Sequence, residues 1–162
     1  MESPIGPLVS EFNRLARRYF ALIESQPVER IAWLAQIQLA VVDLYAAALR
    51  LPKTEPSEFD APGMRNEDQQ SLMDGIFAKL GGDHIFYSFV FDPLQDTEPV
   101  GGLLSEDLSS SYADLYDGTA LLDAGAVGED AVWAWRLGFE SHWGQHALGA
   151  LQALKGVLAH RT

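Results

Sequence analysis

Cysteine is absent from the 162 residues of the chain, and basic residues are scarce. The lack of cysteine excludes disulfide bonds, thiolate nucleophiles and thiolate zinc sites. The 11 Lys and Arg residues face 23 Asp and Glu residues, which gives a formal net charge of -12. A charge of this sign opposes phosphate backbones and anionic membrane surfaces, so neither nucleic acid nor a membrane is an expected partner.

Targeting segments and catalytic motifs are missing as well. The start of the chain, MESPIGPLVSEF, has no basic region followed by an apolar run, so we expect no secretory signal and a cytoplasmic protein. The longest apolar stretch, residues 37–51, contains Gln38, Asp43 and Arg50 and is predicted to be too short and too charged to cross a bilayer. No GxSxG, HExxH, Walker or GxGxxG motif occurs, so no enzyme class is indicated.

Apolar residues make up 48% of the chain, enough for an ordinary globular core. Their spacing predicts helices over residues 8–25, 27–51, 67–80, 105–124 and 128–160, with Asn66 and Ser105 capping the third and fourth. The segment HIFYSFVF, residues 84–91, fits a strand, a buried helical turn or an extended segment. An isolated strand is not expected, because no second convincing strand is present. The prediction is one all-α domain over residues 1–162, a bundle of four to five helices with a long C-terminal helix.

The negative charge is concentrated in the middle of the chain. Residues 51–130 hold 3 basic and 17 acidic side chains, a net charge of -14, whereas residues 1–50 are neutral and residues 131–162 carry +2. Such a segment attracts a cationic partner through long-range electrostatics. The first hypothesis is therefore a non-catalytic interaction protein without a cofactor, which presents residues 51–130 to a basic protein.

A candidate site lies on the last predicted helix. His142 and His146 are four residues apart and fall in its apolar stripe, so both imidazoles can reach one metal ion. Further ligands are expected from Asp107 or Asp114 on the preceding helix, or from His84. The second hypothesis is a bundle that binds a divalent metal or a small ligand on this face, including a metal-dependent enzyme that activates a bound water.

The same residues also fit a purely structural role. The two histidines are then neutral core groups, hydrogen-bonded to Tyr112, Tyr116, an aspartate or a carbonyl. Arg136 forms an ion pair with an acid of the fourth helix, or else clamps an anionic ligand. The tryptophans are core anchors or a ligand platform: Trp133, Trp135 and Trp143. Three glycines on one line of this helix predict close approach of another backbone: Gly138, Gly149 and Gly156.

Four segments resemble one known family: LYAAALRLP at 44–52, YSFVFDP at 87–93, EDLSSSYADLYDG at 106–118 and WAWRLGFESHWGQHALGAL at 133–151. Together they resemble the bacterial family called domain of unknown function 5063, over about three quarters of the chain. The most specific part is Phe139, His142, Trp143, Gly144 and His146. Two positions depart from the family pattern, with Ser110 in place of an aspartate and Lys155 in place of a histidine. The family has no established activity, so the resemblance implies a shared fold and residue set but no function.

Overall fold

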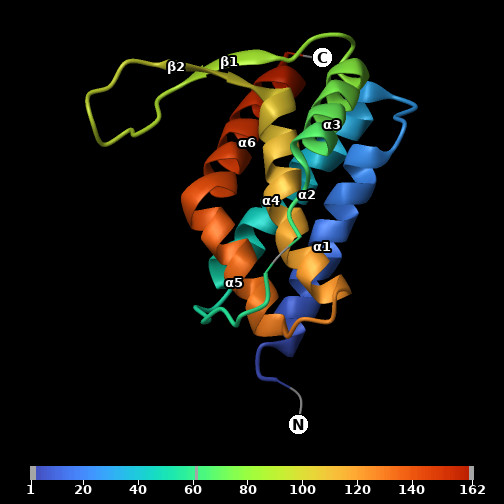
Figure 1. The fold of residues 1–162 in the computed structure, drawn as a ribbon. Coiled ribbons are helices and arrows are strands. Elements are labelled where there is room, and N and C mark those ends of the chain that lie inside the picture. Colours follow the sequence, from blue (N-terminus) through green and yellow to red (C-terminus); the bar gives the residue numbers. More distant parts are fainter. Residues whose placement is uncertain (1–2, 61, 161–162) are drawn as a thin grey trace.

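The computed structural model describes residues 3–60 and 62–160. Its elements are α1 (Gly6–Glu24), α2 (Arg30–Arg50), α3 (Asn66–Lys79), β1 (Phe86–Phe89), β2 (Val100–Leu103), α4 (Leu104–Asp123), α5 (Gly128–Gly138), the π-helical turn η1 (Phe139–Trp143) and α6 (Gly144–Ala159). The helices form one bundle, and the two strands lie across the end opposite the N-terminus (Figure 1). The predicted bundle with a long C-terminal helix is confirmed, with one small hairpin added.

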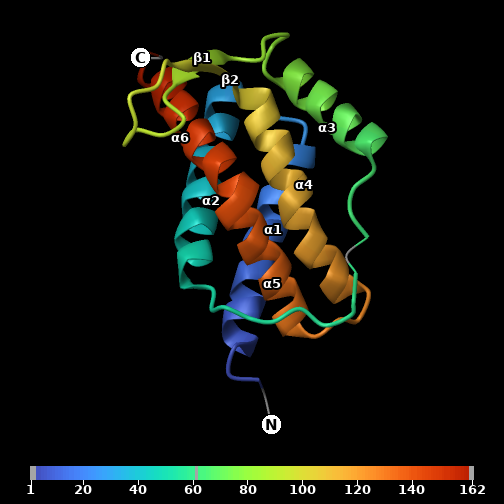
Figure 2. The ribbon, with the colours of Figure 1, turned by 60° about the vertical axis from the view of Figure 1, so that its left-hand side comes forward.

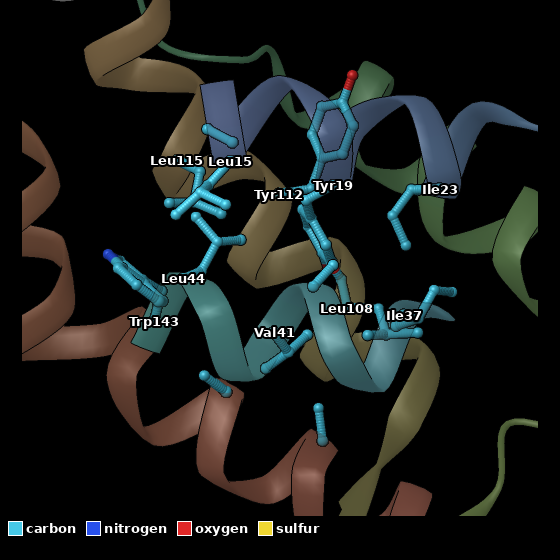
Figure 3. Packing of buried hydrophobic residues seen from close by; sticks show 14 of the residues in the cluster. Leu15, Tyr19, Ile23, Ile37, Val41, Leu44, Leu108, Tyr112, Leu115 and Trp143 are labelled. Carbon is cyan, nitrogen blue, oxygen red and sulfur yellow. The ribbon is translucent and has the colours of Figure 1, made fainter. Parts of the chain in front are cut away.

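The core lies between α1, α2, α4 and the C-terminal helix. Figure 3 shows Leu15 of α1, Leu44 of α2 and Leu108 of α4 directed into this shared interior. Tyr19 is fully buried there, and its hydroxyl donates a hydrogen bond to the Leu108 carbonyl at 2.6 Å. The only polar atom of the side chain is thereby satisfied, as burial requires.

Helix α2 is the most apolar of the long helices. It has 21 residues, and an 18-residue window within it has a mean hydropathy of 1.5, so by length and composition alone it is able to cross a membrane. The prediction that this stretch is too short and too charged is therefore wrong on those two criteria. Trp33, Ile37 and Leu44 are buried within the bundle, so core packing accounts for part of the apolar content of α2.

Within the segment 84–91, residues Phe86–Phe89 form a strand, which is one of the three conformations that fit its sequence, but the expectation that no partner strand exists is wrong. β1 pairs antiparallel with β2, and Tyr87 lies opposite Gly102. The sequence of β2, VGGL, has low strand propensity and no periodic pattern, so nothing in it identifies a partner strand. Gly102 is required by packing, because a Cβ at this position would overlap the ring of Tyr87.

The starts of α3 and α4 differ from the predicted caps. Arg65 and Leu103 precede the two helices, and neither helix has a side-chain cap. At α4, the backbone N–H groups of Leu104 and Ser105 instead donate to the carbonyls of Ile85 and His84, at 3.1 and 3.3 Å. A distant stretch of backbone thus satisfies the donors that a capping side chain would otherwise bind.

The long C-terminal helix is continuous but contains the π-helical turn η1. A π turn holds one residue more than the α-helical turn that it replaces. Trp135 and Trp143 are eight residues apart, yet both are buried. His142 consequently turns outward, and the prediction that it lies in the apolar stripe is wrong because it assumed a regular helix.

Candidate functional site

Five side chains form one continuous chain of hydrogen bonds where the hairpin meets the helices. The Tyr87 hydroxyl of β1 donates to Asp107 Oδ2 of α4 at 2.6 Å, and Asp107 Oδ1 lies 2.8 Å from His146 Nδ1. His142 Nδ1 lies 2.8 Å from Asp114 Oδ2 of α4. The Nε2 atoms of the two rings are 3.2 Å apart and join the two halves. We call His142 and His146 the histidine dyad.

The chain of hydrogen bonds depends on the spacing of the two aspartates along α4, the spacing of the two histidines along the C-terminal helix, and the packing of α4 against α6. Asp107 and Asp114 are seven residues apart, two turns of α4, and therefore lie on one face. Helices α4 and α6 lie side by side in both ribbon views (Figures 1 and 2), so this face meets the histidine dyad. The sequence analysis expected these two aspartates beside the histidines, and the structure brings them together.

The chain of hydrogen bonds runs from the interior to the surface. Asp107 is 5% exposed, and the side chain of His146 is 21% exposed. The side chains of Asp114 and His142 are 23% and 51% exposed. The outer ring of the dyad is thus open to solvent, while the inner ring is anchored on a buried carboxylate.

The carboxylates determine where the ring protons lie. An ionised carboxylate only accepts, so each Nδ1 carries a hydrogen and donates it to its aspartate. The hydrogen bond to Asp107 raises the pKa of His146, against a smaller opposing effect of burial. Burial and the bond to Asp107 raise the pKa of Tyr87 far above its usual value, so this hydroxyl remains a donor. The two Nε2 atoms are left facing each other, and their contact requires a shared proton or another cation between them.

The histidine dyad lies at the edge of a pocket of about 370 Å³. We call it the histidine pocket, and its main lining residues are Tyr87, Phe89, Phe91, Glu106, His142, Gln145 and His146. Aromatic side chains of the hairpin thus face polar side chains of α4, η1 and α6. Within residues 3–60 and 62–160, no group of three or more His, Asp or Glu side chains converges on a common metal position.

The family described as "Domain of unknown function (DUF5063)" matches residues 5–160. The chain belongs to this family. The resemblance noted from the sequence is thereby confirmed. Among solved structures, protein BF1032 from Bacteroides fragilis, a structural genomics target, is similar over 94% of this chain and 93% of its own, with 21% identity and a TM-score of 0.79. At this identity the likeness shows a common fold alone. No curated protein matches the chain.

Two predicted members of the site lie elsewhere in this DUF5063 chain. The Tyr112 hydroxyl donates to Glu24 of α1 at 2.8 Å, not to a histidine, because Tyr112 faces the opposite flank of α4. Arg136 pairs with Glu140 of its own helix at 2.9 Å and donates to the Leu51 carbonyl, not to an acid of α4. Neither residue belongs to the histidine pocket.

The two buried tryptophans of the DUF5063 segment are core residues. Trp135 packs against Phe12 with ring centroids 4.5 Å apart, and its indole N–H donates to the Leu115 carbonyl. The Trp143 indole N–H donates to the Trp135 carbonyl at 2.9 Å, which ties the two sides of η1 together. Trp133 is partly exposed. His84, a third candidate ligand, instead lies 2.5 Å from the Ser105 hydroxyl.

Tyr87 is the site residue that the sequence analysis missed. It belongs to the aromatic segment 84–91, for which the sequence left three conformations open, and no local signal marks its hydroxyl as a partner of Asp107. The sequence feature that came nearest to indicating this contact was the line of glycines on the last helix, Gly138, Gly149 and Gly156. Gly149 does permit a close approach, although of the Tyr87 hydroxyl and not of a backbone, whereas Gly156 has open space around it.

Proposed function

We propose that this DUF5063 member is a small-ligand-binding protein and that the histidine pocket is its binding site. One observation carries the proposal. The two Nε2 atoms of the dyad converge at 3.2 Å while both Nδ1 atoms are held by carboxylates, at the edge of a pocket. Polar groups aimed by a rigid set of partners, beside apolar walls, are typical of small-molecule sites.

The lining indicates the kind of ligand. Phe89 and Phe91 provide apolar faces, Glu106 contributes a carboxylate, and the dyad supplies ring nitrogens. A flat, largely apolar molecule with one polar end matches this distribution, because aromatic side chains favour stacked or edge contacts with another ring. The π turn that positions His142 supports a functional role, since such turns occur frequently at functional sites.

The test uses indole and phenyl fragments that carry one amine or one carboxylate. We expect some of these fragments, at millimolar concentration, to shift the NMR signals of His142, His146 and Tyr87. Gln145→Trp fills the pocket from α6 and should abolish the shifts. Gln152→Trp, an exposed position two turns further along the same helix, is the matched control and should leave them intact. Fragments that bind equally well to Gln145→Trp, or the lack of any such shift in the wild type, would overturn the proposal.

The acidic middle of the chain supports a second candidate function, the binding of a basic protein. The exposed acids of this segment include those of the stretch before α3, with Glu55, Glu58 and Asp60, and those of the hairpin connection, with Asp96 and Glu98. These places lie at opposite ends of the bundle (Figure 1), so each is a separate surface. Asp107, Asp114 and Asp130 are instead engaged in internal hydrogen bonds.

Neutralising each surface separately tests this second candidate. A specific basic partner should be retained by the wild-type chain at low salt. One of the two double variants, Glu55→Gln/Glu58→Gln or Asp96→Asn/Glu98→Gln, should lose this partner, and the other should retain it. Equal retention by both variants would mean that neither acidic surface forms the contact.

A further inference from the structure

We propose that the histidine dyad binds one divalent transition-metal ion through the Nε2 atoms of His142 and His146. The inference rests on the proposed function, because the ion would lie in the histidine pocket and form its polar end.

The ring nitrogens that are free to bind an ion are the two Nε2 atoms. Each Nδ1 is 2.8 Å from a carboxylate oxygen and therefore carries the ring proton. In the neutral form of each ring, Nε2 then holds a lone pair. His142 and His146 thus both present the same ring nitrogen, in the same tautomer, to one position.

The distance between the two Nε2 atoms also fits a shared ion. Two imidazole nitrogens bound to one tetrahedral ion, at bond lengths of about 2.0–2.1 Å, lie about 3.3–3.4 Å apart. The observed separation between His142 Nε2 and His146 Nε2 is 3.2 Å. The ring planes are inclined to each other at 77°, and the ring centroids are 4.6 Å apart.

Both rings are backed by carboxylates, those of Asp107 and Asp114. Metal-binding histidines almost always donate the other ring N–H to a carboxylate or a carbonyl, which orients the ring and increases its basicity. Both members of this dyad do so, and Asp107 is itself buried and held by the Tyr87 hydroxyl. An ordinary pair of surface histidines at this spacing lacks such support. The aspartates therefore orient the ligands, in contrast to the sequence hypothesis in which they bind the metal directly.

One side of the proposed metal site is open to the histidine pocket. Within the part of the chain that the structure describes, no third His, Asp or Glu side chain is placed to bind the same ion as the two histidines. The remaining coordination positions of the ion therefore face the histidine pocket, where water or a donor atom of a small ligand completes them. Two imidazoles select zinc, copper, nickel or cobalt over magnesium and calcium.

Titration with Zn²⁺ by calorimetry, and with Co²⁺ by its visible absorption, tests the site directly. We expect one ion per chain, with no competition from millimolar Mg²⁺. His142→Asn should abolish this binding, and since His142 is half exposed the variant should keep its fold, which near-ultraviolet circular dichroism checks. His160→Gln changes an exposed histidine at the far end of the same helix and should bind like the wild type.

A further variant separates a built site from a chance pair of histidines. Asp114→Asn leaves both ligands in place but removes the carboxylate behind His142, and should weaken Zn²⁺ binding by about 10- to 100-fold. Wild-type affinity in Asp114→Asn, Zn²⁺ binding that survives His142→Asn, or no binding at one equivalent would each overturn the inference. The fragment experiment is run without metal, so fragment binding without Zn²⁺ binding would reject the metal site and leave the proposed function standing.

Discussion

Asp107 is the residue on which the site depends most. Its side chain is almost fully buried, and each of its oxygens has one partner, Tyr87 on one side and His146 on the other. A buried carboxylate that loses a partner costs more than an ordinary hydrogen bond, because its desolvation is no longer compensated. Substitutions that displace either partner should therefore lower the free energy of unfolding as well as the affinity for a ligand.

Gly149 provides a test of this dependence. A Cβ at this position would overlap the Tyr87 hydroxyl and would lie 3.2 Å from Asp107 Oδ2. Gly149→Ala should therefore destabilise the protein by about 1–3 kcal/mol, as overpacking does, despite the better helix propensity of alanine. Gly156→Ala, on the same helix with no atom within 4 Å of the new methyl group, should stabilise it by about 0.5–1 kcal/mol. Urea unfolding measures both, and a stabilising Gly149→Ala would contradict the contact.

The raised pKa of Asp117 predicts a specific dependence of stability on pH. Burial, with a smaller contribution from Asp114, raises its pKa to about 6. In the unfolded chain an aspartate has a pKa of about 3.9, so the folded state binds the proton more tightly and loses stability as the pH rises from about 4 to 6. Asp117→Asn removes this penalty. The melting temperature of the variant should match the wild type near pH 4 and exceed it at pH 8.

The exposed Asp60 is the control for this comparison, because Asp60→Asn alters the net charge by the same amount. The difference in melting temperature between Asp60→Asn and the wild type should remain small and constant over the same pH range. If Asp117→Asn behaves in the same way, the carboxyl of Asp117 is not destabilised by burial.

At the scale of elements, the turn η1 explains the main error in placing the site. Helical periodicity correctly predicted the last helix and the pairing of Asp107 and Asp114 with the histidines, because these depend on regular repeats. It wrongly placed His142 in the core. Because η1 holds one extra residue, Trp143 instead of His142 lies on the buried face of the helix. No local motif in FESHW signals a π turn, which is stabilised by the packing of both tryptophans.

A deletion tests this interpretation of η1. Removing Ser141, which is exposed within the turn, should restore a regular helix and keep both Trp135 and Trp143 on the buried face. Removing Gln152, exposed in the regular part of α6, should instead rotate the following residues by about 100° and expose Ala153 and Leu154. Near-ultraviolet circular dichroism and urea unfolding should show a folded Ser141 deletion and a severely destabilised Gln152 deletion. Equal losses would show that η1 does not accommodate an extra residue.

The hairpin and the start of α4 were not predictable for a related reason. β2 contains two glycines, which weaken the strand pattern, and one of them, Gly102, is needed for contact with Tyr87. The first donors of α4 are satisfied by the carbonyls of His84 and Ile85, so no capping side chain is needed. Both features arise from contacts between segments that are far apart in the sequence, which local propensity does not contain.

At the scale of the whole molecule, the excess of acids should oppose folding. The charge of -12 repels itself in the compact state, and the ion pairs between exposed residues, such as Arg17 with Asp123, contribute little. Raising NaCl from about 0.02 to 0.2 M shortens the Debye length and should increase the melting temperature. The increase should be smaller in Asp96→Asn/Glu98→Gln, which carries two charges fewer. A melting temperature that falls with salt would mean that attractive pairs dominate instead.

Asp107 also links the hairpin to the histidine dyad through side chains. The hairpin touches the helices near this residue, and the acceptor of its Tyr87 hydroxyl is the same carboxylate that orients His146. A change of charge on the imidazole therefore alters the strength of the bond that fastens the strands. Thermodynamic linkage makes this relation reciprocal, so whatever orders the hairpin also shifts the affinity of the dyad for its occupant by the same factor. Hydrogen exchange at the amides of β1 and β2 is thus a remote measure of what the two imidazoles hold.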